Sequence, residues 1–165
     1  MGSIITGILV LIVCLLPFVL MSRSHRKKEK ALLLALYESA KKNHCNISQY
    51  DTWSNAAIGI DLTSNLIFFT KKIKDINGNQ QVVLADIERC RVVRTNHSEN
   101  ASSSHYNAIE KLELVFIYQA NNKAAIVLEF YNAEHDGPTL AGELQLAEKW
   151  CAMANNRLEV VSNKA

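Results

Sequence analysis

Histidine, cysteine and carboxylate side chains are the groups of this 165-residue chain that could carry acid-base, metal or thiol chemistry. Their spacing does not favour it, because the chain has no HExxH pattern, no Cys/His knuckle, no GxSxG elbow and no glycine-rich phosphate loop. His97 and His105 lie in a Ser/Asn-rich stretch that would not hold a fixed geometry, and His44 and His135 are isolated. We therefore expect no catalytic residue, no metal site and no cofactor, and a protein that is not an enzyme.

The four cysteines are far apart in the sequence and form no CxxC pair; they are Cys14, Cys45, Cys90 and Cys151. We expect reduced thiols, with Cys90 and Cys151 packed as small hydrophobic side chains. Two carboxylates, Asp61 and Asp86, stand at the ends of expected strands. For these we expect turn capping or ion pairing, which are structural roles.

The first 22 residues contain no charged side chain and are apolar almost throughout. Residues 4–22 would form a helix of about 28 Å, close to the thickness of a hydrocarbon core. Lys and Arg follow at once, and such residues are retained on the cytoplasmic side of a membrane. We therefore predict a single-pass anchor in the cell membrane over residues 1–22, with the N-terminus outside and the following domain cytoplasmic.

A cleaved signal peptide is the alternative interpretation of this apolar segment. It requires basic residues before the apolar run and small residues at its end, whereas here the charges follow and the run ends in Val19-Leu20-Met21-Ser22. If the orientation were reversed, disulfides and N-linked glycosylation would become available to the domain.

Charge is unevenly distributed after the anchor. Residues 23–44 carry seven Lys/Arg against two Glu, a net charge of +5, whereas residues 45–165 carry a net charge of −3. We predict a basic juxtamembrane linker whose contacts with anionic headgroups are made by Arg23, Arg26, Lys27, Lys28 and Lys30. Nucleic-acid binding is the other use of a basic cluster, and the position beside the membrane span disfavours it.

Residues 29–42 are predicted to form a helix, because they are rich in Ala, Leu, Glu and Lys and contain no Gly or Pro. Its apolar face consists of Leu32, Leu33, Leu36, Tyr37 and Ala40. We expect this linker helix to dock partly on the domain that follows. The pattern is too short for a coiled coil, and no oligomeric state follows from it.

From Asn46 the pattern changes from helical to alternating, which predicts antiparallel strands. Six are visible, at residues 57–62, 66–72, 81–84, 90–94, 111–118 and 124–131. Asn77–Gly78 is expected to form a tight turn, and residues 95–108 a long loop. A final helix is expected from Asp136 to about Leu158, with Asp136 or Thr139 as its N-cap.

This pattern resembles the pleckstrin-homology-like (PH-like) superfold at Ile58-Gly59-Ile60-Asp61, at residues 84–88 before a strand, and at Ala147-Glu148-Lys149-Trp150 in the last helix. The resemblance implies an α+β fold, in which residues 45–161 form an antiparallel barrel or sandwich of about seven strands capped by the C-terminal helix. Residues 162–165 would be a tail. It also implies a binding module, since such barrels generally recognise lipids, peptides or proteins.

The best-known PH-like domains bind phosphoinositides through Lys and Arg in the first hairpin loop, but Thr63-Ser64-Asn65 in that loop is uncharged. The basic cluster of the domain is Lys71, Lys72 and Lys74, which we take as the candidate contact for a ligand or headgroup. Because the anchor already delivers the domain to the bilayer, a protein or peptide partner is favoured. The alternatives are a small structural subunit of a larger membrane complex and a lipid-headgroup-binding domain.

Overall fold

The computed structural model describes residues 26–73, 76–96, 109–120 and 122–162. The described part begins with a helix over residues 26–42. Seven strands follow, separated after the fourth by the 3-10 helix η1 (Leu84–Asp86): β1 (Gln49–Trp53), β2 (Ala56–Asp61), β3 (Leu66–Ile73), β4 (Ile76–Val83), β5 (Ile87–Asn96), β6 (Ile109–Tyr118) and β7 (Ile126–Asn132). The chain then forms a single-turn helix α2 (Ala133–Asp136) and the long helix α3 (Glu143–Ser162).

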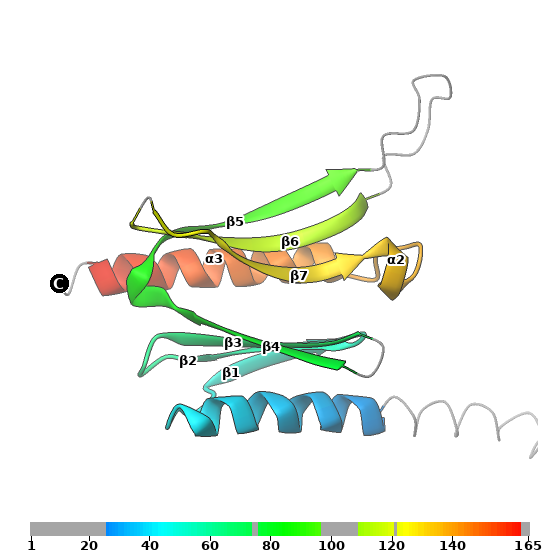
Figure 1. Cartoon of the computed structure of the whole chain (residues 1–165), viewed down its shortest axis with the longest axis horizontal. Coiled ribbons are helices and arrows are strands. Elements are labelled where there is room, and N and C mark those ends of the chain that lie inside the picture. The colour runs from blue at the N-terminus through cyan, green and yellow to red at the C-terminus, as the bar shows by residue number, and fades with distance from the viewer. Residues whose placement is uncertain (1–25, 74–75, 97–108, 121, 163–165) are drawn as a thin grey trace, which may run out of the picture.

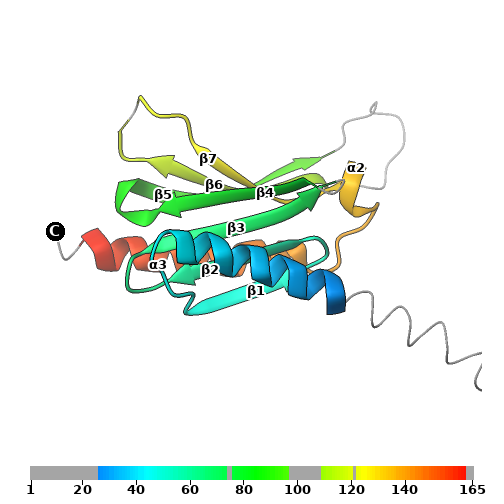
Figure 2. The same ribbon diagram turned by 60° about the horizontal axis from the view of Figure 1, so that its bottom comes forward.

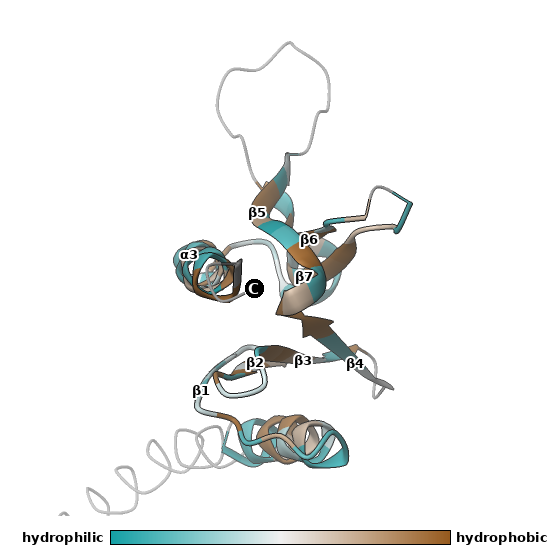
Figure 3. Cartoon of the chain, turned by 90° about the vertical axis from the view of Figure 1, so that its left-hand side faces the viewer, coloured by the Kyte–Doolittle hydropathy of each residue, from teal (hydrophilic) through white to brown (hydrophobic). Residues whose placement is uncertain are grey.

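The strands form two antiparallel sheets, with the orders β1-β2-β3-β4 and β5-β6-β7. The sheets face each other, and α3 lies along one side of the space between them (Figures 1 and 3). The expected α+β fold with two antiparallel layers and a C-terminal helix is thus confirmed. A closed barrel is wrong, since no main-chain pairing joins the two sheets in the described ranges.

The core fills the space between the sheets and α3. Both sheets contribute fully buried apolar side chains, such as Ile58 and Phe116, and α3 contributes Trp150 and Ala154. The alternation in residues 111–118 and 124–131 predicts seven inward side chains. Tyr118 and Ile126 are only partly buried, and the other five are buried: Leu112, Leu114, Phe116, Leu128 and Phe130. The period of two therefore identified the inner face of the second sheet.

The helix of residues 26–42 packs on the outer face of the first sheet, across β2 and β3 (Figure 2). Its buried side chains are Leu32, Leu36 and Ala40, as predicted, whereas Tyr37 of the expected apolar face is 43% exposed. Gly59 of β2 permits this contact: a Cβ there would lie 3.2 Å from Leu36 Cδ2 and 2.9 Å from Ile47 Cγ2. The helix is thus part of the folded unit.

Three sequence expectations about the elements are corrected. Asn77–Gly78 is not a turn, because β3 and β4 pair without interruption as far as Ile73↔Ile76. The sequence predicts no strand at residues 49–53, where the structure has β1. The last helix begins at Glu143, and neither expected N-cap serves it, because Asp136 ends α2 and binds Lys71 instead.

The predicted anchor of residues 1–22, together with Arg23, lies outside the described residues, as do Lys74 and most of the expected loop. Within the part of the chain that the structure describes, no helix is both long enough and apolar enough to cross a membrane.

Asp61 caps the β2–β3 turn, as expected. Its carboxylate accepts hydrogen bonds from the main-chain N–H groups of Asn46, Thr63 and Ser64 and from the Ser64 hydroxyl, at 2.7–3.1 Å. Burial raises the pKa of Asp61, but these hydrogen bonds outweigh it and lower the pKa to about 2.

We expect this turn to make stability depend on pH. Because the folded pKa of Asp61 lies below its ordinary value of 3.8, its stabilisation is complete above pH 5 and is lost as the pH falls toward 2. The contribution is about 2 kcal/mol. Urea unfolding of the full chain in detergent micelles, followed by fluorescence of the two tryptophans, should show a smaller loss of unfolding free energy between pH 5 and 2 for Asp61→Asn. An equal loss of unfolding free energy in the unmodified chain and in Asp61→Asn would contradict this role of Asp61.

Candidate binding cleft

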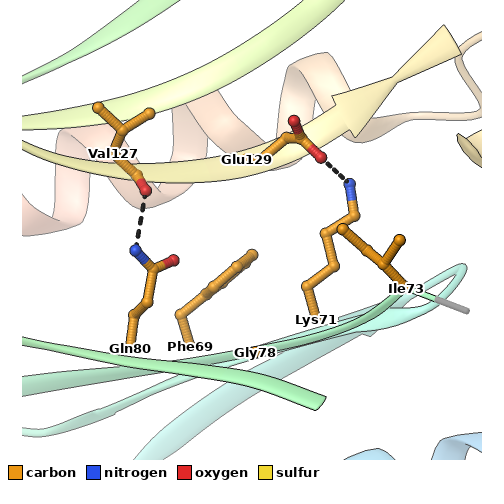
Figure 4. A pocket seen from close by; sticks show the side chains of 7 residues that line it. All are labelled: Phe69, Lys71, Ile73, Gly78, Gln80, Val127 and Glu129. Carbon is orange, nitrogen blue, oxygen red and sulfur yellow. Dashed lines mark hydrogen bonds and ion pairs between the residues drawn. The ribbon is translucent and has the colours of Figure 1, made fainter. Parts of the chain in front are cut away.

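On the side away from α3, the edge strands β4 and β7 are neighbours but do not pair through their main chains (Figure 3). A hollow of about 360 Å³ lies there, which we call the β4–β7 cleft. Figure 4 shows its lining, which comes from β3 (Phe69, Lys71 and Ile73), β4 (Gly78 and Gln80) and β7 (Val127 and Glu129). Strand β3 supplies its residues at alternate positions, because residues two apart share one face of a strand.

The apolar wall of the cleft continues into an aromatic cluster. Phe69 stacks on Phe130 with ring centroids 6.0 Å apart, and Trp53 stacks on Phe130 at 4.6 Å. Trp53 Nε1 also donates a hydrogen bond to the main-chain oxygen of Phe130, at 2.9 Å. Val127 on the opposite wall is 38% exposed. The cleft therefore offers apolar surface that is held in a fixed position.

One end of the cleft is closed by a buried ion cluster. Lys71 Nζ lies 2.9 Å from Glu129 Oε1 and 2.7 Å from Asp136 Oδ2, and the side chains of Lys71 and Asp136 are only 4% and 3% exposed. Asn132 supports the cluster, because its main-chain N–H donates to Asp136 and its side-chain amide to Glu129. The second oxygen of Asp136 is buried and accepts no hydrogen bond from a described residue.

The charge state of this cluster follows from its partners. Burial raises the pKa of Glu129, but the hydrogen bond and charge of Lys71, with smaller contributions from Asn132 and Lys111, lower it overall. Glu129 is therefore ionised at neutral pH, and the ammonium of Lys71 is already engaged by two carboxylates.

The other end of the cleft is bridged by Gln80. Its Nε2 donates to the main-chain oxygen of Val127 at 3.1 Å, so a side chain of β4 reaches the edge of β7 (Figure 4). The side chains of Gln80 and Trp53 thus bond two main-chain carbonyl groups of β7, those of Val127 and Phe130. The two sheets are thereby held together on this side without closing into a barrel.

The lysines of the predicted basic cluster do not share one environment. Lys71 points into the sandwich, Lys72 is exposed, and Lys74 lies outside the described residues. A headgroup could reach Lys71 only by displacing Glu129 and Asp136. Of the linker residues, Arg26, Lys27, Lys28 and Lys30 are all exposed along the first turns of the N-terminal helix.

Sequence reasoning missed the acidic partners of Lys71, because Glu129 and Asp136 are 58 and 65 residues away. A signal for Lys71 itself was present. It follows Ile67 and Phe69 at alternate positions, and both of these face the core, so the period of two places Lys71 on the inner face.

The histidines and cysteines do not gather at the cleft in the described part of the chain. His44 and His135 are exposed, and no group of three His, Cys, Asp or Glu side chains that could hold a metal ion occurs among the described residues. Cys90 in β5 and Cys151 in α3 are free thiols, with Cys151 Sγ 3.4 Å from the main-chain oxygen of Cys90. Burial, together with the neighbouring Cys151, raises the pKa of the Cys90 thiol well above its ordinary value.

No protein-family model matches this chain. No curated protein and no solved structure matches it either. The function is therefore argued from the residues of the chain itself.

Proposed function

We propose that this chain is a non-enzymatic binding module, anchored in the cell membrane by residues 1–22, whose cytoplasmic domain recognises a protein or peptide partner at the β4–β7 cleft. The observation that carries the proposal is the half-open, apolar-walled cleft beside an exposed strand. Pre-formed concave sites with apolar walls and a few fixed polar groups are typical ligand-binding sites, and such a site beside a free strand edge is one way in which domains recognise extended peptides. The cleft residues offer shape and hydrogen bonds, and the amine among them, that of Lys71, is paired with two carboxylates.

The arrangement of the elements also supports a recognition domain. The described chain has seven antiparallel strands followed by a C-terminal helix, and such an order of elements is compatible with the PH-like resemblance on which this proposal draws. The exposed basic residues Arg26, Lys27, Lys28 and Lys30 lie close to the proposed anchor, where anionic headgroups would attract them.

The two alternatives have less support. A lipid headgroup needs free cationic side chains, and Lys71 of the predicted cluster is held by two carboxylates. A structural subunit should expose an apolar face to its neighbour, either that of the N-terminal helix or that of the strands, and the helix face of Leu32, Leu36 and Ala40 is covered by the first sheet. The described domain is self-contained, which favours a tethered recognition module.

Site-specific photocrosslinking in native membranes tests the proposal. The full chain carries benzoylphenylalanine at position 127 in the cleft or, as a matched control, at position 160 on α3; Val127 and Val160 are 38% and 41% exposed. We expect a discrete protein adduct from position 127 only. The adduct should be lost when Gly78→Leu fills the cleft, since the nearest atom to a Cβ there is Lys71 O, at an ordinary 3.6 Å.

Adducts with lipid alone, equal adducts from both positions, or no adduct would overturn the partner-binding function. The same cells report the topology through the partly buried Cys45. We expect an impermeant thiol reagent to label Cys45 only after the cells are opened. Labelling in intact cells would place the domain outside.

A further inference from the structure

We infer that the partner contributes an extended segment that pairs with the free edge of β4 as an added strand and places an apolar side chain in the β4–β7 cleft. This inference rests on the proposed function and specifies how the partner is held. Exposed sheet edges carry unpaired main-chain N–H and C=O groups that accept another strand, so proteins usually protect them. The four edge strands of the two sheets, β1, β4, β5 and β7, differ in this protection.

The edge of β5 is protected by α3. The side-chain amide of Asn155 makes both main-chain bonds of Cys90, accepting from its N–H at 2.9 Å and donating to its C=O at 2.9 Å. An ion pair between Arg94 and Glu148 holds the same two elements farther along. The main-chain N–H and C=O groups of Cys90 are therefore not available to pair with an added strand.

The edges of β7 and β1 are also protected. On β7, Gln80 and Trp53 occupy the carbonyl groups of Val127 and Phe130, and the pairing with β6 is irregular at this point. Strand β1 has only five residues, and its Asp51 side chain is held by Lys149 and Trp150 of α3. Short strands, irregular pairing and covering side chains are known ways of blocking edge-to-edge association.

Among the described residues, the edge of β4 shows none of these features. The strand is eight residues long, pairs with β3 without a register shift, and has the sequence INGNQQVV, with no charged residue and no proline. Its residues 78–81 are exposed. No other described strand pairs with this edge. Of the four edges it is the one ready to accept a strand.

The register shows which main-chain groups are free. Just beyond β4, Leu84 N donates to Asn65 O at 3.0 Å, and the pairing is regular from there to Ile73↔Ile76. In an antiparallel pair, residues bonded to the partner strand alternate with residues whose N–H and C=O point away. The even-numbered residues of β4 therefore bond to β3, and residues 77, 79, 81 and 83 present their main-chain groups outward.

The cleft lies on the inner face of this edge. Gly78 and Gln80 belong to its lining, and Val127 stands across from them (Figure 4). Alternate side chains of an added strand would point to this inner face, over the apolar wall. The lining includes the apolar side chains of Phe69, Ile73 and Val127, and its ammonium, that of Lys71, is already paired with Glu129 and Asp136, so an apolar side chain fits there better than an anionic one.

A second copy of this chain fits less well than a different partner. Two β4 strands paired antiparallel about a two-fold axis would present the same inner face, to which Gly78, Gln80 and Val82 belong. Val82 is already fully buried in its own core, and Gln80 bonds Val127. None of these three described residues therefore brings a free apolar side chain for the cleft, whereas a segment with apolar residues at alternate positions does.

Selection of displayed random dodecapeptides against the full chain in lipid nanodiscs tests the inference. We expect selected peptides with alternating apolar residues, and slower amide hydrogen exchange at residues 79 and 81 when they bind. Gln81→Pro removes one outward N–H without touching the β3 ladder and should weaken binding at least tenfold, whereas Gln81→Ala should change it less than twofold. Val83→Pro against Val83→Ala is a second pair, because the φ of Val83, −88°, is near that of proline.

The outcomes separate the inference from the proposed function. If position 127 still crosslinks to a protein, but neither proline variant weakens peptide binding or the protected amides lie elsewhere, strand addition is wrong and the binding function stands. If no peptide is selected, or if the proline variants instead abolish self-association of the chain, the inference is likewise overturned. Loss of both the protein crosslink and peptide binding overturns the function itself.

Discussion

Replacing Lys71 with alanine is expected to lower the free energy of unfolding by about 3–5 kcal/mol, because it leaves the buried carboxylate of Asp136 without a cation and leaves Glu129 with only the 3.4 Å contact to Lys111. The ammonium lies within 2.9 Å of Glu129 and 2.7 Å of Asp136, and the Asp136 side chain is 3% exposed. Urea unfolding of the full chain in micelles at pH 7, followed by tryptophan fluorescence, measures the change. The fluorescence is suitable because the two tryptophans, Trp53 and Trp150, both pack in the core.

A matched control separates the effect of burial from that of ion pairing. Lys149 Nζ lies 2.6 Å from Asp51, an equally short pair, but its side chain is 52% exposed. Lys149→Ala should therefore lower the free energy of unfolding by less than about 1 kcal/mol. The combined variant Lys71→Met, Glu129→Gln, Asp136→Asn removes all the charges together and should recover most of the lost stability. Similar costs for Lys71→Ala and Lys149→Ala would contradict the assignment of Lys71 as a buried charge.

The sequence predicted most of the sheet because its strands alternate. Strands β6 and β7 are recognisable from Leu112, Leu114, Phe116, Leu128 and Phe130, whose inward positions follow the period of two. Strand β1 could not be found in this way, since Gln49–Trp53 is mostly polar and none of its residues is fully buried. Pairing with β2 creates this strand, and pairing between segments is not visible in local composition.

Local turn and cap signals were overruled by tertiary contacts. The Asn77–Gly78 pair favours a hairpin turn, but continued pairing with Lys71 and Lys72 keeps both residues in β4. Asp136 is a good N-cap residue, yet its carboxylate is taken by Lys71. The α3 helix therefore begins seven residues later, at Glu143.

Only part of the candidate site was predictable. Lys71 was selected as a ligand contact from its basic neighbours, and its inward register was readable, but the positions of Glu129 and Asp136 depend on how the second sheet faces the first. The cleft itself is a property of the open side of the sandwich and has no local sequence signal. The anchor, by contrast, remains a prediction from sequence, because residues 1–22 lie outside the described part.

Trp150→Ala is expected to lower the free energy of unfolding by about 3–5 kcal/mol. Trp150 is fully buried, so a large cavity would remain between α3 and the sheets. Its indole Nε1 also donates to Asp51 Oδ2 at 2.8 Å, which fixes α3 to β1. Circular dichroism during urea unfolding is the suitable measurement, because the substitution removes one fluorescent reporter. We expect a lower midpoint with an unchanged slope.

The two contributions of Trp150 can be separated by Trp150→Phe. Phenylalanine fills much of the volume but cannot donate to Asp51, whose Oδ2 keeps its 2.6 Å contact with Lys149. The cost should therefore be about 1–2 kcal/mol, well below that of alanine. If Trp150→Phe cost as much as Trp150→Ala, the bond to Asp51 rather than core packing would hold α3 against the first sheet. Protection of the β1 edge would then depend on that single bond.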